Sequence, residues 1–312
     1  MAVSGSKNYA ITGANIIESA LRKLGEYDAG EAIPGDETSA ALMALNLMVK
    51  EYAARGADIW LRDEITLFLQ PDTKSYALGT TNATATITGE TTLTNAEAIS
   101  STVWEVASSS GMTAADIVGV KTTDNTIHWD VIASVDSSTQ ITGTTGLDVA
   151  AASGAKVYAY TTTAGRPLKI LSAFRRSTDN IDIKVEIIGE SDYAQQSNKS
   201  SNGPPVEIWY QPTLTTGTLF VWPIDGGSTY DKLIMNCAFH TDDFDTTADS
   251  PQFPIEWGNT LVWGLAAELG PEYGLPEREQ AKMFEIAEHK LKTALDWDVE
   301  NASVIFALEE GR

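Results

Sequence analysis

The sequence predicts an α+β protein in which helical pairs at both ends of the chain form a four-helix bundle, with an antiparallel β region between them. Apolar residues recur at helical spacing near both ends, and alternate with polar residues through the middle. We therefore expect residues 1–75 and 165–312 to form one core, and residues 76–164 to form an inserted all-β domain, a sandwich or a barrel. A length of 312 residues suits about two domains.

Two helices are predicted near the N-terminus. Thr12 is placed to cap the first helix, and Gly25 follows its last apolar residue. Asp36 is placed to cap the second helix, which ends at Gly56. The apolar stripes of the two helices are Ile16, Ile17, Ala20, Leu21 and Leu24, and then Leu42, Leu45, Val49 and Tyr52.

Two more helices are predicted near the C-terminus. Pro254 precedes the stripe of the first, and Gly270 closes it, while Pro276 starts the longest helix. The predicted buried positions are Trp257, Leu261, Leu265 and Leu269, and then Phe284, Ala287, Leu291, Ala294 and Leu295. The apolar segment that follows Asn301 either folds back onto the core of its own chain or inserts into a partner.

Alternation of apolar and polar residues predicts the strands. In the flanks they lie at residues 64–70, 181–188, 218–223 and 232–239. In the insert they lie at residues 84–88, 101–106, 116–120, 126–132 and 156–160. Residues 80–164 hold 29 Ser or Thr among 85 positions, which indicates either a solvated β surface or a carbohydrate-binding face built on Trp104, Trp129 and Tyr158.

The composition excludes several classes of protein. A formal charge of −22 is the opposite of what a protein that grips phosphates carries. The single cysteine, Cys237, cannot form an internal disulfide or a Cys-rich zinc site. No stretch of about 18 apolar residues occurs, so we expect a soluble protein, made in a cytoplasm, with no membrane contact.

No catalytic pattern is present in the sequence. The three histidines, His128, His240 and His289, stand in no diagnostic motif, and no glycine-rich phosphate loop occurs. The acidic side chains of residues 240–250 suit either a hard cation or a solvated loop; they are Asp242, Asp243, Asp245 and Asp249. We predict no catalytic residues, no cofactor and no metal site. A carboxylate-based cell-wall hydrolase is a weaker alternative, because no spacing selects a pair among Glu18, Glu26, Glu64 and the other acids.

Both helical flanks resemble a family of virion proteins. The features that carry the resemblance are AlaLeuArgLysLeuGlyGlu at 20–26, the acidic helix after it, and TrpGlyLeuAlaAlaGluLeuGlyProGluTyrGlyLeuPro at 263–276 before a long charged helix. These features resemble the head-to-tail adaptor proteins of short-tailed bacteriophages, also called tail tubular or head-completion proteins. The resemblance covers about 120 residues and leaves out the Ser/Thr-rich insert.

The resemblance implies a structural role in a virion. Adaptors of this family form a ring, commonly a dodecamer, between the portal protein and the tail nozzle, through which the genomic DNA leaves without specific binding. The C-terminal arm, residues 300–312, would dock onto the portal. The matching apolar positions are Val304, Ile305, Phe306 and Leu308.

Two further interactions are predicted. The adjacent Arg175 and Arg176 either pair with acids of their own chain or contact an acidic neighbour across a ring interface. The insert would contact tail fibres or appendages, or bind carbohydrate in the alternative function.

Overall fold

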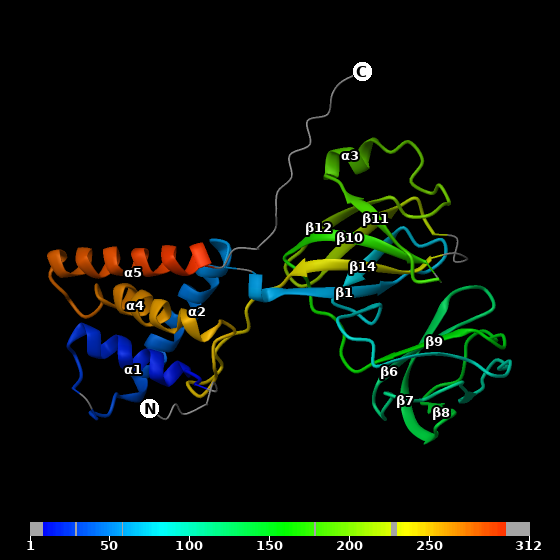
Figure 1. The fold of residues 1–312 in the computed structure, drawn as a ribbon, viewed down its shortest axis with the longest axis horizontal. Helices are drawn as coiled ribbons and strands as arrows, with labels where there is room; N and C mark the ends of the chain where they lie inside the picture. The colour runs from blue at the N-terminus through cyan, green and yellow to red at the C-terminus, as the bar shows by residue number, and fades with distance from the viewer. Residues whose placement is uncertain (1–8, 29, 58, 178, 226–229, 298–312) are drawn as a thin grey trace, which may run out of the picture. The chain divides into compact units, whose positions relative to one another are not determined.

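The chain folds into two compact units, one helical and one built of β-strands (Figure 1). The computed structural model describes residues 9–28, 30–57, 59–177, 179–225 and 230–297. Residues 1–61 and 240–312 belong to the helical unit, and residues 62–239 to the β unit. The α+β class predicted from the sequence is confirmed. The strands before and after the predicted insert belong to the β unit together with the insert, and not to the helical unit. The two units therefore meet in the chain at other residues than the predicted domains do.

Four α-helices make up the helical unit. They are α1 (Gly13–Leu24), α2 (Gly35–Ala54), α4 (Gly258–Leu269) and α5 (Glu277–Trp297), with the short 3-10 helices η1 (Ile59–Leu61) and η2 (Ile255–Trp257). In this unit α4 lies between α1 and α5 (Figure 1). All four helices contribute to one apolar core, which includes Ile16, Leu21, Leu45, Val49, Trp257, Leu261, Leu265 and Leu291.

The start and end of α1 follow from local chemistry. Thr12 and Asn15 form a capping box, in which each side chain accepts a hydrogen bond from the backbone N–H of the other. Gly25 ends the helix in the left-handed conformation (φ 81°), which glycine adopts at little cost. Both assignments made from the sequence are confirmed.

Two details of the predicted helices are wrong. Asp36 does not cap α2, because the helix already begins at Gly35 after Pro34. Asp36 instead lies in the first turn, where a negative charge stabilises the helix N-terminus. Phe284 is not on the buried face of α5, since its side chain is 51% exposed, whereas Ala287 and Leu291 are buried as predicted.

An eight-stranded sheet forms one part of the β unit. Its strand order is β2-β13-β12-β11-β10-β14-β1-β3, and only the β11–β12 pair is parallel among the described residues. The strands are β1 (Arg62–Phe68), β2 (Ser75–Leu78), β3 (Ala83–Thr84), β10 (Lys169–Ser177), β11 (Asp182–Ile187), β12 (Glu207–Pro212), β13 (Gly217–Trp222) and β14 (Tyr230–Ala238). A short helix, α3 (Glu190–Gln195), lies between β11 and β12. One face of the sheet encloses a core that includes Leu67, Leu78, Ile208, Leu219 and Met235.

A second, barrel-like sheet of six strands forms the rest of the β unit. Its order is β4-β9-β6-β7-β8-β5. A bridge between Leu93 and Val106, which directly follow β4 and β5, links the first strand of this order to the last. The strands are β4 (Gly89–Thr92), β5 (Val103–Glu105), β6 (Ile117–Lys121), β7 (Ile127–Ser137), β8 (Gln140–Gly143) and β9 (Lys156–Tyr160). Closure removes the open edges that isolated sheets expose, so the barrel has its own core.

Aromatic side chains join the barrel to the eight-stranded sheet. Phe68 of β1 is fully buried against Trp129, Tyr158 and Tyr160 of the barrel, with ring centroids 5.2, 4.7 and 6.1 Å away. The buried Lys232 of β14 adds an ion pair with the exposed Glu90 of β4, at 2.6 Å. Ring contacts of this kind contribute beyond the area they bury, so the barrel is held to the sheet by a packed joint.

The predicted strand at residues 84–88 is wrong. β3 ends at Thr84, whose hydroxyl accepts a hydrogen bond from the N–H of Thr86 and donates one to the carbonyl of Thr162. Such side-chain to backbone bonds compete with strand pairing. Five strands, β2, β4, β8, β10 and β12, were not predicted.

Candidate functional site

The outer face of α2 carries exposed apolar side chains. Met43 and Leu47 are 66% and 62% exposed, and the exposed Ala40 lies one turn before Met43. Spacings of three and four residues place the three side chains on one face. We call Ala40, Met43 and Leu47 the α2 stripe. The opposite face of α2 is buried in the core through Ala41, Leu45, Met48, Val49 and Tyr52.

A helix that is apolar on two faces is typical of a helix with neighbours on both sides. The core supplies one set of neighbours for α2, and the stripe meets water. Burial of a side chain such as Met43 or Leu47 contributes about 1.5–3 kcal/mol. The α2 stripe is therefore suited to a protein–protein contact.

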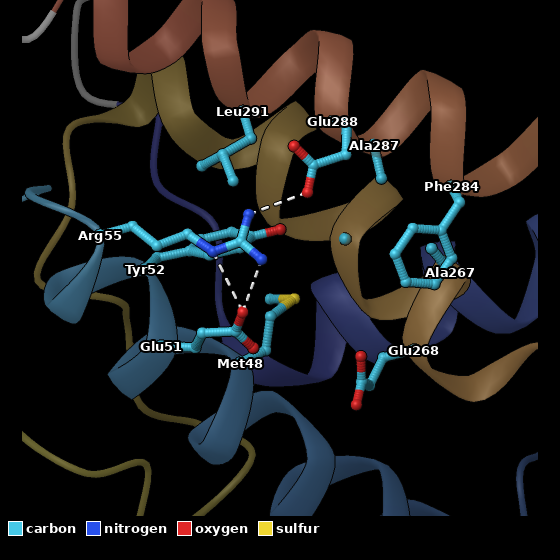
Figure 2. Close-up of a pocket in the computed structure, with 11 residues that line it drawn as sticks. Met48, Glu51, Tyr52, Arg55, Ala267, Glu268, Phe284, Ala287, Glu288 and Leu291 are labelled. Atoms are coloured by element: carbon cyan, nitrogen blue, oxygen red, sulfur yellow. Dashed lines mark hydrogen bonds and ion pairs between the residues drawn. The ribbon is translucent and has the colours of Figure 1, made fainter.

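The inner side of α2 is fixed against α5 by an arginine (Figure 2). Arg55 follows the last turn of α2, and its guanidinium contacts Glu51 of α2 at 2.7 Å and Glu288 of α5 at 2.8 Å. The hydrogen bonds to Glu288 and then Glu51 raise the pKa of Arg55 above its ordinary value. Because the pairs are exposed, each contributes little to stability; they link the end of α2 to α5.

A glycine lets α2 approach α4 closely beside this arginine. The Tyr52 hydroxyl lies 2.1 Å, and the Met48 sulfur 2.7 Å, from the position that a Cβ would occupy at Gly264. Burial raises the pKa of Tyr52 to about 12, so its hydroxyl stays protonated at neutral pH. The hollow in Figure 2 is thus lined by the neutral phenol of Tyr52 and by the guanidinium of Arg55, which is paired with two carboxylates. It results from the packing of the helices. We find no nucleophile and base arranged for catalysis among the residues that line it.

One carboxylate links two loops at the other end of the helices. Glu37 of α2 accepts hydrogen bonds from Tyr27, at 2.5 Å, and from Tyr273, at 3.0 Å. Tyr27 lies between α1 and α2, and Tyr273 between α4 and α5. The hydrogen bond to Glu37 raises the pKa of Tyr27 to about 12. The contact ties the N-terminal helical pair to the C-terminal pair.

Arg175 and Arg176 both lie in β10, where they contact their own chain. Arg176 forms two hydrogen bonds with Asp182 of β11, both at 2.7 Å, and holds the pKa of that carboxyl below its ordinary value. Arg175 donates a hydrogen bond to the carbonyl of Pro205. Of the two alternatives left open by the sequence, the geometry of Arg176 matches pairing within the chain. A contact of these arginines across a ring stays a prediction.

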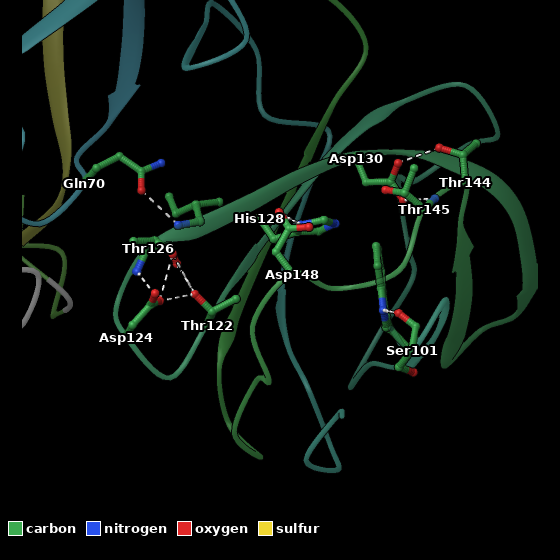
Figure 3. Close-up of polar contacts among 12 residues, drawn as sticks. Gln70, Ser101, Thr122, Asp124, Thr126, His128, Asp130, Thr144, Thr145 and Asp148 are labelled. Atoms are coloured by element: carbon green, nitrogen blue, oxygen red, sulfur yellow. Dashed lines mark hydrogen bonds and ion pairs between the residues drawn. The ribbon is translucent and has the colours of Figure 1, made fainter. Parts of the chain in front are cut away.

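The Ser/Thr-rich barrel uses its hydroxyls to hold carboxylates (Figure 3). In Figure 3, Asp124 accepts hydrogen bonds from Thr122 and Thr126. Asp136 likewise accepts hydrogen bonds from Thr142 and Ser134. These hydroxyls lower the pKa of both carboxyls. The abundance of Ser and Thr therefore has a structural use in turns and strand ends.

A hydroxyl and a backbone N–H hold a buried carboxylate of the barrel. Asp130 accepts hydrogen bonds from Thr144 and from the N–H of Thr145 (Figure 3). Burial alone would raise its pKa, but these hydrogen bonds outweigh it and the pKa is lowered. Three carboxylates of the barrel are thus stabilised in their charged form.

The aromatic residues nominated for carbohydrate binding do not form an exposed platform. Trp104 and Tyr158 are fully buried, and Trp129 packs on Phe68. Trp104 also donates its indole N–H to the carbonyl of Ser101. Sugar recognition by these three rings is therefore not supported by their positions.

The acidic loop before α4 is held by contacts within the chain. Lys50 pairs with Asp243 at 2.8 Å, and Gln252 donates to Asp242. Asp249 accepts a hydrogen bond from the N–H of Thr246. Within the described ranges, no group of three or more His, Cys, Asp or Glu side chains is arranged to hold a metal ion.

His128 contacts Asp148 at 3.0 Å at the barrel, and the His128 side chain is largely buried.

Comparison with known proteins assigns no relative. No known protein family matches the chain, and no curated protein matches it. Among the helices that the structure describes, none is long and apolar enough to cross a membrane. The predicted portal contacts Val304, Ile305, Phe306 and Leu308 lie outside the described residues.

The α2 stripe was missed at the sequence level. Both faces of α2 carry apolar residues, and the spacing alone does not tell which face is covered by the rest of the chain. The signal that was available is the apolar character of the helix around its whole circumference, from Ala40 to Val49. The triad of Tyr27, Glu37 and Tyr273 had no sequence signal, because its members come from three separate segments.

Proposed function

We propose that the protein is a structural head-to-tail adaptor of a short-tailed phage virion, without enzymatic activity or a cofactor. Copies of the chain form a ring below the portal that connects the capsid to the tail and leaves a channel for the exit of DNA. The observation that carries the proposal is the α2 stripe on a helical unit whose N- and C-terminal helices share one core. In this proposal the four helices act as a four-helix bundle, as the adaptor resemblance implies.

The ring is built by contacts between copies of the helical unit. The α2 stripe of one subunit packs against its neighbour, because a ring offers every copy the same partner surface. Burial of the exposed parts of Met43 and Leu47 contributes on the order of 2–4 kcal/mol per interface. The C-terminal arm contacts the portal protein, and the barrel faces the tail nozzle or the tail fibres.

The charge of the chain suits a channel through which DNA passes. About twelve copies with a charge of −22 each carry roughly −264 in total. Binding of DNA needs cations that release counterions from the phosphates. An acidic ring repels the genome and does not hold it at the head–tail junction of the virion. The subunit itself is made in the host cytoplasm.

The decisive experiment is native mass spectrometry of the purified chain, alone and after mixing with a portal ring. We expect binding in a fixed multiple, such as twelve copies per portal ring. The double variant Met43→Asp/Leu47→Asp should remain folded by circular dichroism and fail to complete the ring. A matched control is Leu214→Asp, since Leu214 is 97% exposed in the turn between β12 and β13.

A chain that ignores the portal ring at all ratios would contradict the adaptor function. Ring completion by the double variant as efficient as by the Leu214→Asp control would show that the α2 stripe is not the subunit contact.

A further inference from the structure

An apolar groove lies beside the last two turns of α5. It is lined on one side by Trp257 and Thr260, at and after η2, and on the other by Lys290, Thr293, Ala294 and Trp297 of α5. The four α5 residues are spaced three, four and seven apart, so they form one stripe along the helix. The groove has a volume of about 290 Å³, close to the lower end of the roughly 300–1,000 Å³ of small-ligand pockets. It therefore holds a few side chains and not a folded domain.

The exposed aromatic side chains at the end of the groove indicate that it has an occupant. Trp297 is 54% exposed and stacks on Trp60, itself 53% exposed, with ring centroids 5.9 Å apart. Tryptophans are enriched among the residues that contribute most to binding interfaces. A peptide with apolar side chains would cover this surface.

The chain itself supplies such a peptide next to the groove. Residues 298–312 follow Trp297 directly, and Val304, Ile305 and Phe306 form the apolar part of that segment. Val304 follows Trp297 by seven positions, an extended reach of roughly 23–25 Å. The α5 side of the groove, from Lys290 to Trp297, is about 10 Å long. The segment is therefore long enough to turn back and lie along the groove.

We propose that the groove between η2 and α5 is the docking site of the Val304–Phe306 segment of the same chain. The apolar side chains of the segment fill the groove beside Ala294 and Trp297. The short tether gives the segment an effective concentration of the order of millimolar at the groove. A segment of another molecule would compete with it only at a higher concentration. The proposal concerns the isolated chain and does not depend on a portal.

Disulfide trapping in the full-length chain tests this contact. The variant Thr293→Cys/Phe306→Cys places one thiol on the groove stripe and one on the segment. The control variant is Lys292→Cys/Phe306→Cys, since Lys292 is exposed, adjacent in the chain, and absent from the groove lining. The native thiol does not interfere, because Cys237 is fully buried and burial raises its pKa to about 12. The proteins are incubated with oxidised glutathione at low concentration, and the products are separated by mass without reduction.

We expect a monomeric disulfide in the Thr293 variant to form at least tenfold faster than in the Lys292 control. Adding Trp297→Ala should slow trapping, whereas Phe284→Ala, an equally exposed aromatic of α5 outside the groove, should not. Equal rates in the two cysteine pairs would overturn the proposal. Trapped dimers in place of monomers would also overturn it, and would show that the segment of a second copy occupies the groove.

Discussion

At the scale of single residues, the helical unit depends on the absence of a side chain at Gly264. The sequence places this glycine inside a helix, where it costs up to about 1 kcal/mol relative to alanine. The structure gives the reason, because the Tyr52 hydroxyl and the Met48 sulfur lie where a Cβ would be. Gly264 therefore lowers the helix propensity of α4 and allows a close contact between α2 and α4.

The first prediction concerns this contact. Gly264→Ala should destabilise the protein by about 1–3 kcal/mol, because the added methyl group forces Tyr52 and Met48 to move in a packed region. Urea unfolding followed by circular dichroism measures the change. The matched control is Gly35→Ala in the first turn of α2, where nothing lies within 4 Å of the added Cβ. It should be neutral or stabilising by at most about 1 kcal/mol. Equal stability of the two variants would show that α2 does not approach α4 this closely.

At the scale of elements, the two ends of α1 and most buried helix positions were predictable, whereas the start of α2, the exposure of Phe284 and strand β10 were not. Thr12 and Gly25 act within a few residues of themselves, so the sequence contains the whole cause of the ends of α1. Phe284 has the helical spacing of a core residue, yet it lies at the rim of the hollow beside Gly264 (Figure 2). Strand β10 was missed because charged residues such as Arg175 and Arg176 interrupt its alternation, and its pairing with β14 contains two register shifts.

The second prediction concerns the buried face of α5. Leu291→Ala should destabilise the helical unit by about 2–5 kcal/mol, because the Leu291 side chain is 3% exposed in the shared core. Phe284→Ala, on the same helix but half-exposed, should cost less than about 0.5–1 kcal/mol. Thermal and urea unfolding of both variants provide the measurement. A smaller loss for Leu291→Ala than for Phe284→Ala would mean that α5 is rotated about its axis.

The third prediction concerns the barrel and pH. Hydrogen bonds from hydroxyls lower the pKa of Asp124 and Asp136 below the ordinary 3.8 when the barrel is folded. A lowered pKa gives stability that is fully present above the unfolded value and is lost as pH falls through the folded value. Protection of the barrel amides from hydrogen exchange should therefore be constant from pH 7 to about 5 and decrease below about pH 4.

The variant Asp124→Asn/Asp136→Asn tests the cause of that decrease. It should be less protected than the native chain at pH 6, because two charged acceptors are gone, and its protection should change less with acid. The same acid sensitivity in this variant as in the native chain would assign the effect to other carboxylates.

At the scale of the whole molecule, the net charge and the order of helical and β segments along the chain were more informative than any short sequence motif. The placement of helices at both ends of the chain is confirmed, and both ends of the described chain enter the same helical unit. How the Ser/Thr-rich segment is used was not predictable, because its aromatic residues alternate with polar ones and either face of a strand could have been buried. Only the closed barrel decides this, by burying Trp104 inside and placing Tyr158 against Phe68.

The fourth prediction is that the chain does not bind double-stranded DNA. With a charge of −22, it should give no shift in a gel assay even at about 50 mM salt, where electrostatic binding is strongest. A salt-dependent complex would reveal a local basic surface and would contradict an acidic, repelling channel.

The last prediction separates the two roles given to the C-terminal segment. Deleting residues 303–312 should weaken binding to a portal ring at least tenfold, because the apolar positions Val304, Ile305, Phe306 and Leu308 are lost. The same deletion should shift the melting temperature of the isolated chain by only a few degrees, since the core of α1, α2, α4 and α5 forms without those residues. The full-length variant Phe306→Ser keeps the length and the charge of the segment and removes only one apolar side chain. It therefore separates the loss of apolar contact from the loss of length and acidity. A fall in melting temperature as large as that of Leu291→Ala would place the segment in the core of the helical unit. Portal binding would then require partial unfolding of the subunit, and the adaptor proposal would need a different contact.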